Sequence, residues 1–254
     1  MKFFRAGFRF GSALMLFLTA YLDFVFRIKL GGRAKSLKAR AKWLQLWAGR
    51  LLRILRVDVE WQGTPPSRGL MVSNHLGYVD VLVYGSICPL IFLSKSEVKS
   101  WPVAGPLTRC AGTLYINRQN KAEVMRAGAD LEKVVQAGMV VTLFLEGTSS
   151  DGSKVLPFRS SLLAPAEEHG WLVTPSWIHY SMQDGSVAKD VAYWGDMTFF
   201  PHFLRLLTKQ SVQAHVRFGA PVTKKPGRKE LARELHVEVC RMKERYEAGE
   251  VFAK

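Results

Sequence analysis

From residue 57 onward, short apolar runs rich in β-branched residues alternate with stretches of helical character, and this alternation most constrains the fold. Several of the runs are continuously apolar, as strands buried on both faces of a sheet tend to be. Strands that alternate with helices build α/β domains. We therefore expect an α/β fold with a mixed, largely parallel sheet flanked by helices. The expected strands are 57–63, 70–74, 90–94, 113–117, 140–147, 171–180 and 212–219.

Helical character is clearest in four stretches that separate these strands. The expected helices are 78–86, 96–109, 121–138 and 160–170. The third of them ends at Gly138, a typical stop signal. The closing stretch, 224–250, begins beside Pro226 and carries acidic and basic residues at helical spacing, which predicts a surface helix.

The basic charge of the chain is concentrated at its N-terminus. The formal net charge is +15, and residues 1–56 hold thirteen Lys and Arg against a single acid, Asp23. The remaining residues hold 23 basic and 20 acidic side chains, so that part is nearly balanced. A length of 254 residues with 48% hydrophobic content fits one large domain behind a basic N-terminal segment.

An apolar stretch lies inside this basic segment. The 17 residues between Arg9 and Arg27 contain no basic side chain and one acid. A membrane span needs roughly 20 apolar residues. We therefore expect the stretch to lie in one leaflet, with the domain on the cytoplasmic side of the membrane, in agreement with the positive-inside rule. A signal peptide is the alternative, although AYLDF is a poor cleavage site.

Residues 34–57 predict a second membrane-seeking element. Five apolar residues recur at spacings of three, four or seven, which is helical periodicity: Leu37, Leu44, Trp47, Leu51 and Leu55. Basic residues surround Trp43 and Trp47, and a basic amphipathic helix with tryptophans suits an anionic membrane surface. A helix packed on its own domain is one alternative. Nucleic-acid binding is another, but it explains only the charge and leaves the apolar stretch unexplained.

Neither a disulfide framework nor a metal site is indicated by the ligand-type residues. Cys88, Cys110 and Cys240 form no C-x-x-C pair, and the simplest setting is the reducing cytoplasm. The histidines other than His75 are scattered along the chain, so we expect no metal.

The stretch VSNHLGYVD, residues 72–80, places His75 in a loop between an expected strand and an expected helix, with Asp80 in the first helical turn. Such loops commonly carry reacting groups in α/β folds. A carboxylate five residues away can hydrogen-bond one imidazole nitrogen, and this raises the basicity of the other nitrogen. The alternative is structural: Asn74 or Asp80 caps the helix and His75 is solvated.

A second strand runs into a polar loop at VVTLFLEGTSSDG, residues 140–152. Glu146 stands at the end of the strand, Gly147 gives close backbone access, and Thr148 follows as a hydroxyl donor. These residues are either part of a site or a turn with Asp151-Gly152 at its corner. The chain contains no G-x-S-x-G, H-E-x-x-H or Walker A sequence, which argues against those hydrolase and nucleotidase classes.

Four ordered segments resemble the glycerolipid acyltransferase family typified by 1-acyl-glycerol-3-phosphate acyltransferases. Their N-H-x4-D block is matched by Asn74 to Asp80, and their aromatic strand ending in arginine by GTLYINR, which ends at Arg118. FLEGTSS, residues 144–150, is similar to F-P-E-G-T-R-S, and WLVTPSWI, with Pro175, to the fourth block. Lys95, in FLSKSEVKSWPVAGPL, is expected to support the site. The resemblance covers about residues 57–222.

This resemblance implies a membrane-associated O-acyltransferase at the cytoplasmic face of the inner membrane, with membrane helices in 1–56 and a catalytic domain in 57–254. His75, oriented by Asp80, would take the proton from a lysolipid hydroxyl that attacks an acyl thioester. Acyl-CoA or acyl-carrier protein would be the donor, no further cofactor is implied, and no nucleic acid is expected as a partner. Arg118 would bind the acceptor's anionic head, since a guanidinium suits phosphate or carboxylate.

The chief departure from the family is Ser149, which stands where E-G-T-R has its arginine. In the family that arginine helps to hold the phosphate of the acceptor, so Lys154 or Arg159 would have to replace it. We expect 1-acyl-glycerol-3-phosphate as the acceptor, converted to phosphatidic acid. The alternative is lyso-ornithine lipid, because FLSKSEVKSWP together with EGTSSDG is similar to the branch that acylates this aminolipid.

Overall fold

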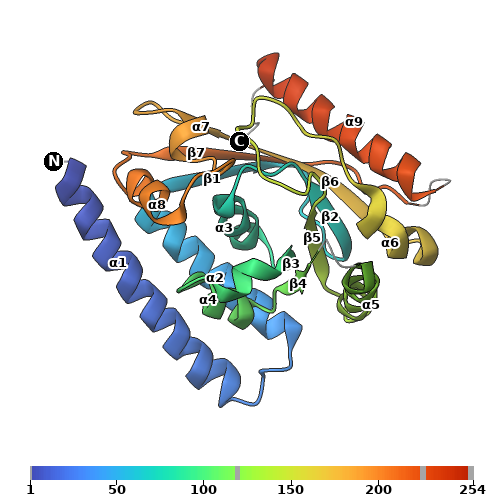
Figure 1. Ribbon diagram of the computed structural model, residues 1–254, viewed down its shortest axis with the longest axis horizontal. Coiled ribbons are helices and arrows are strands. Elements are labelled where there is room, and N and C mark those ends of the chain that lie inside the picture. Colours follow the sequence, from blue (N-terminus) through green and yellow to red (C-terminus); the bar gives the residue numbers. More distant parts are fainter. Residues whose placement is uncertain (1, 118–120, 224–226, 251–254) are drawn as a thin grey trace.

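The computed structural model describes residues 2–117, 121–223 and 227–250. A sheet of seven strands has the order β1-β7-β6-β2-β5-β3-β4 (Figure 1). The strands are β1 (Val57–Gln62), β2 (Gly69–Ser73), β3 (Leu90–Lys95), β4 (Leu114–Ile116), β5 (Val140–Phe144), β6 (Val173–Ser181) and β7 (Val212–Phe218). Neighbouring strands are parallel apart from β6 and β7, which are antiparallel. The predicted mixed, largely parallel sheet is confirmed.

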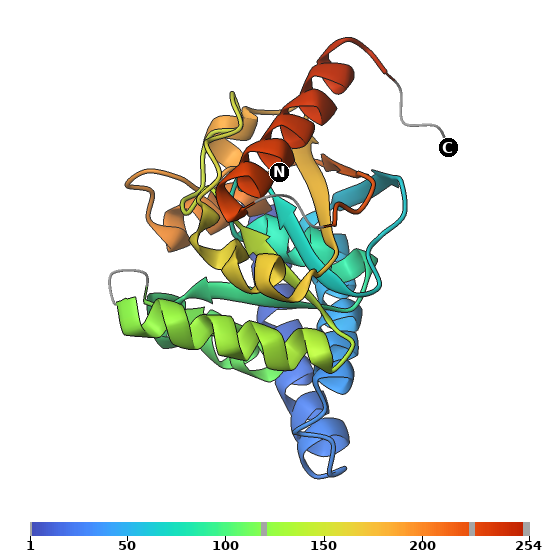
Figure 2. The same cartoon turned by 90° about the vertical axis from the view of Figure 1, so that its right-hand side faces the viewer.

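Helices cover both faces of this sheet (Figures 1 and 2). They are α1 (Lys2–Asp23), α2 (Leu37–Leu55), α3 (Tyr78–Ile87), α4 (Ala104–Ala111), α5 (Lys121–Gln136), α6 (Ala164–His169), α7 (Val187–Asp190), α8 (Phe199–Leu207) and α9 (Arg228–Glu247). Met71 of β2 packs in a core with α1, α2, α3 and α8, whereas Leu70 and Val72 pack in a second core with α5, α6 and α9. This alternation is the period of two expected of a strand buried on both faces.

The single helix predicted over 96–109 is wrong. A 3-10 helix spans Ser96–Ser100, and α4 begins only at Ala104. Pro102 disfavours helical backbone at Trp101 and has no N–H to donate. Val103 then adopts a φ of 63°, a conformation in which a β-branched residue is strained.

The sequence did not predict α8, whose residues are FFPHFLRLL. Pro201 lies in its first turn, where a proline costs no hydrogen bond within the helix. The helix therefore forms around a residue that usually indicates a break.

The tryptophans of α2 face the protein. Trp43 is buried and donates its indole N–H to the carbonyl of Ala20, 3.1 Å away. Trp47 donates to Asp23 at 3.0 Å, so the one acid of the apolar N-terminal stretch is held within the protein. Both indoles thus pack within the protein, against the end of α1, and contact of α2 with a membrane surface stays a prediction.

The N-terminal helix keeps an apolar outer face. The run Lys2–Lys29 is long and apolar enough to cross a membrane, the one such helix in the described part of the chain. Its exposed large side chains are Phe3, Phe4, Phe8, Leu14, Met15, Leu18, Tyr21, Leu22 and Phe26. An exposed apolar face of this size indicates membrane association.

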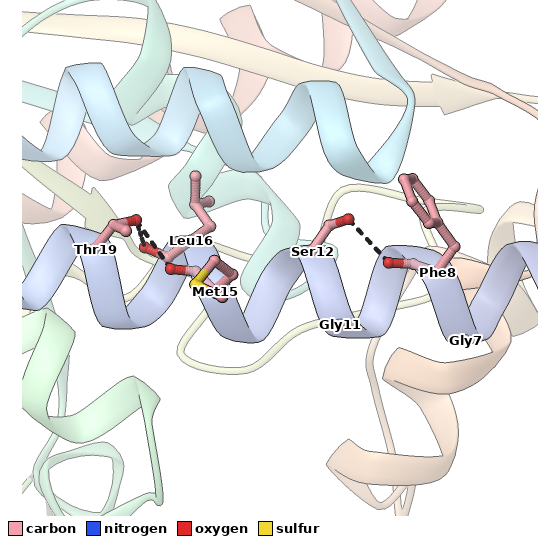
Figure 3. A pocket seen from close by; sticks show the side chains of 7 residues that line it. All are labelled: Gly7, Phe8, Gly11, Ser12, Met15, Leu16 and Thr19. Atoms are coloured by element: carbon pink, nitrogen blue, oxygen red, sulfur yellow. Dashed lines mark hydrogen bonds between the residues drawn. The ribbon is translucent and has the colours of Figure 1, made fainter.

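A shallow hollow of about 600 Å³ lies on this helix (Figure 3). Its lining residues are Gly7, Phe8, Gly11, Ser12, Met15, Leu16 and Thr19. Ser12 donates its hydroxyl to the carbonyl of Phe8 and Thr19 to that of Met15, both at 2.9 Å. Because these hydroxyls are satisfied within the helix, the hollow is compatible with hydrocarbon chains.

Arg9 anchors α1 to the domain. Its guanidinium is buried and donates to the carbonyls of Leu207, Lys209 and Gln210. These carbonyls follow the C-terminal end of α8, where positive charge is favourable. Arg9 thus ties the first half of α1 to the end of α8, while Trp43 and Trp47 of α2 hold its last turns.

Replacement of Arg9 by Met should loosen α1, because three carbonyls lose their donor. We expect the free energy of unfolding to fall by about 1–3 kcal/mol, with faster tryptic cleavage at Arg27. The matched control is Arg5→Met on the same helix, since Arg5 has no side-chain hydrogen bond among the described residues. Equal effects of the two substitutions would contradict the anchoring role of Arg9.

Candidate active site

The site lies where the neighbouring parallel strands β2 and β5 end together, beside the middle of β6. Ser73, the last residue of β2, is in register with Phe144 of β5 and Ser176 of β6. The loops that follow β2 and β5 therefore meet at one edge of the sheet, the usual place for reacting groups in α/β folds. His75 lies on the first loop and Glu146 on the second.

His75 and Asp80 form the predicted pair. The Nδ1 atom of His75 lies 2.8 Å from Oδ2 of Asp80. Asp80 is fully buried, while the His75 side chain is 22% exposed. Because a carboxylate only accepts, Nδ1 carries the proton, and Nε2 is left with a lone pair for a substrate.

The Asp80 carboxylate is held by three further donors. Its Oδ2 atom accepts the backbone N–H groups of Leu76 at 2.7 Å and Gly77 at 2.9 Å. Its Oδ1 atom accepts the hydroxyl of Tyr180 at 2.7 Å. Burial, and then the charge of Asp80, raise the pKa of Tyr180 well above its ordinary value, so that the phenol stays protonated and donates. Asp80 therefore caps α3 and orients His75 at once.

Glu146 supports the backbone of His75 from the second loop. Its Oε2 atom accepts the N–H of His75 at 3.2 Å, and its Oε1 atom accepts that of Leu156 at 2.9 Å. Burial raises the pKa of Glu146 to about 8, against the opposing effect of these two hydrogen bonds. Ser150 donates its N–H to the carbonyl of His75 at 2.9 Å. The two loops are thus joined on both sides of His75.

Asn74 and Phe144 fix the remaining freedom of His75. The Asn74 amide exchanges two hydrogen bonds of 2.9 Å with the backbone of Ile178. The imidazole ring stacks on Phe144, with 3.9 Å between ring centroids. The amide is therefore a bridge between strands, and it does not contact the reacting atoms.

Tyr193 closes the site from a third segment. It donates its N–H to the carbonyl of Leu76 at 2.7 Å, and its own carbonyl accepts the hydroxyl of Ser149 at 2.5 Å. Gly77 permits this approach, because a Cβ there would lie 2.8 Å from the Tyr193 nitrogen. The Tyr193 ring packs with Tyr78 and Trp101, which gives an aromatic cluster at the start of α3.

The other predicted residues lie at varied places. Gly147, at a φ of 79°, makes the turn after Glu146, and the Thr148 side chain is exposed. Lys95, at the end of β3, and Lys154 are exposed, with no side-chain hydrogen bond among the described residues. Pro175 lies within β6, level with Val72. Arg159 lies beside α9, and Arg118 falls outside the described residues.

Tyr180 and Tyr193 were not predicted as parts of the site. Both come from segments far along the chain from His75, and neither carries a local motif. The side chains of the strand segment WIHY point alternately to the two faces of the sheet. This pattern alone cannot identify which hydroxyl reaches a buried acid. Within the described ranges, no group of three or more His, Cys, Asp or Glu is placed to hold a metal ion.

Comparison with known proteins identifies relatives of this chain. The acyltransferase family model matches residues 56–179. A lyso-ornithine lipid O-acyltransferase of Pseudomonas aeruginosa is 33% identical over 87% of this chain and 85% of its own length. A 1-acyl-sn-glycerol-3-phosphate acyltransferase of Neisseria meningitidis is 31% identical over 47% of each chain.

The fold also matches a solved structure. The crystal structure of the 1-acyl-sn-glycerophosphate acyltransferase of Thermotoga maritima superposes with a TM-score of 0.66 and 22% identity, over 97% of this chain and all of that one. The sequence relatives and the shared fold together lead to one conclusion: this chain belongs to the acyltransferase family and is a lysolipid O-acyltransferase.

Proposed function

We propose that the protein transfers an acyl group from a thioester to the hydroxyl of a lysolipid, with His75 as the general base. The observation that carries the assignment is the Asp80 carboxylate, which holds Nδ1 of His75 at 2.8 Å and leaves Nε2 for the substrate. A positioned base of this kind accelerates proton transfer by about 10²–10⁴.

The proposed reaction is a direct transfer without an acyl-enzyme. Nε2 of His75 takes the proton as the acceptor oxygen forms a bond to the thioester carbonyl carbon. The carbon–sulfur bond then breaks, and the thiolate takes the proton back from Nε2. The Thr148 hydroxyl is our candidate donor to the oxyanion, since such donors provide much of the stabilisation in acyl transfer.

Lyso-ornithine lipid is the acceptor that we favour. Four relatives with that name are 33%, 33%, 35% and 32% identical to this chain. Ser149 is neutral, and its hydroxyl donates to the Tyr193 carbonyl. This position therefore provides no positive charge for a phosphate. The second candidate is 1-acyl-glycerol-3-phosphate, for which the exposed Lys154 could supply a charge.

The proposed location is the cytoplasmic face of the inner membrane, with α1 in one leaflet. Phe10 of α1 contacts Phe200 of α8, and Phe199 of α8 packs against Tyr78 and Trp101 at the site. Aromatic side chains therefore extend from α1 through α8 to Tyr78, the first residue of α3. We infer that acyl chains reach the site along an apolar path that opens toward α1.

His75→Ala should reduce acyl transfer by about 10²–10⁴-fold and leave binding to vesicles unchanged. The assay follows thiol release from acyl-CoA in the presence of lysolipid. The control is His169→Ala at the end of α6. Turnover retained by His75→Ala would refute the assigned base.

Tyr180→Phe, which removes one hydrogen bond to Asp80, should reduce the rate of acyl transfer about tenfold in the same assay.

Glu146→Gln should change how stability depends on pH. Because the folded pKa of Glu146 is raised to about 8, its contribution to stability is complete below its unfolded pKa and is lost as pH rises through about 8. The substituted amide does not titrate and accepts through one oxygen only, so the variant should be less stable by about 1 kcal/mol at pH 6. Urea unfolding at pH 6 and pH 9 should show that the difference in free energy of unfolding between the native protein and the variant is smaller at pH 9. A larger difference at pH 9 would contradict a protonated Glu146.

An acceptor panel tests the head group. Labelled acyl-CoA is offered with lyso-ornithine lipid, lysophosphatidic acid and lysophosphatidylethanolamine, and we expect the aminolipid lyso-ornithine lipid to react fastest. Ser149→Arg should raise the relative rate with lysophosphatidic acid by about tenfold, since it adds a charged donor. Ser149→Ala controls for the lost contact to Tyr193. A preference of the native protein for lysophosphatidic acid would contradict our choice.

A further inference from the structure

We propose that a basic pocket between α9 and residues 157–160 binds the phosphate groups of the coenzyme A that carries the acyl donor. The pocket has a volume of about 440 Å³. Its polar lining comes from two elements: Arg159 and Ser160 on the loop, and Lys229, Arg233 and His236 on the helix. This inference rests on the proposed use of an acyl thioester.

The pocket has an excess of positive charge that the protein does not neutralise. Lys229, Arg233 and His236 follow at spacings of four and three, so they share one face of α9. Arg233 pairs with Glu230, with Nε and Oε2 3.1 Å apart. Arg159 and Lys229 form no salt bridge among the described residues. Two such cations and several N–H and O–H donors around one hollow suit a ligand with more than one phosphate.

The position of the pocket favours a ligand that arrives from water. The sheet separates α9 from α1, the helix with the apolar outer face (Figure 1). A lipid head group in the same membrane as α1 would therefore lie on the other side of the domain. A soluble polyanion can reach the pocket without entering the bilayer.

A continuous segment connects the pocket with His75. Ser150 donates its N–H to the carbonyl of His75, and Leu156 donates to Glu146, whose other oxygen accepts from His75. The next residue, Pro157, lines the pocket. This link fits a donor that has phosphates at one end and a thioester on a flexible arm at the other. Coenzyme A thioesters have this form.

Direct binding of free coenzyme A tests the pocket independently of turnover. Titration calorimetry on the full chain should give binding of coenzyme A, weaker binding of dephospho-coenzyme A, and none of pantetheine, which has no phosphate. Arg159→Glu and Lys229→Glu should each weaken coenzyme A binding by about tenfold or more, as loss of about 1.4 kcal/mol would. A glutamate in the first turn of α9 is compatible with the helix, so Lys229→Glu should fold.

Arg245→Glu is the matched control, because it reverses the same charge at an exposed position near the other end of α9. In steady-state assays the pocket variants should raise KM for acyl-CoA about tenfold and leave KM for the lysolipid unchanged. Coenzyme A binding that is equal in Lys229→Glu and Arg245→Glu would overturn the inference. The inference would also be overturned if the pocket variants lost activity only when acyl-carrier protein was the donor. Normal coenzyme A binding without any thioester consumption would instead refute the proposed function and leave the pocket intact.

Discussion

The buried carboxylate of Asp80 is the interaction on which the rest of the site depends. It accepts four hydrogen bonds, from His75, Leu76, Gly77 and Tyr180. A buried charge is tolerated only when its hydrogen-bonding capacity is met. Displacement of any one of these donors would therefore leave the carboxylate incompletely satisfied. One group therefore starts α3, bends the preceding loop, fixes the imidazole and joins this loop to β6.

The sheet supplies the framework that brings these donors together. Parallel pairing of β2 with β5 places their ends in register, and the loops after these strands become neighbours. On the other side of β2, β6 continues past this level to Ser181 and carries Tyr180. Glu146 then holds the backbone of His75 from one side, while Tyr193 reaches it from the other through Leu76. The catalytic loop is thus supported by two other chain segments, those that carry Glu146 and Tyr193.

Local patterns predicted the parts of this arrangement that are close in sequence. The strands follow from the apolar runs, and the same runs place His75, Asp80 and Glu146 in or beside polar loops. The catalytic role of the His75 and Asp80 pair followed only from the resemblance to the acyltransferase family. Tyr180 lies 100 residues from Asp80, and no local rule identifies that contact. The tryptophans of α2 show a different limit: a basic amphipathic helix has the same sequence pattern whether its tryptophans face lipid or another helix. Arg159 was considered for the acceptor's phosphate, yet its side chain lies in the pocket beside α9.

The central claim is that Asp80 holds His75 with the proton on Nδ1 and a free lone pair on Nε2. Nitrogen-15 NMR of histidine-labelled protein, at a pH where the ring is neutral, measures this directly, and the spectrum of His75→Ala assigns the signals. We predict a protonated Nδ1 and an unprotonated Nε2 for His75. A protonated Nε2 would contradict the account, because that nitrogen could not then accept the proton of the lysolipid hydroxyl.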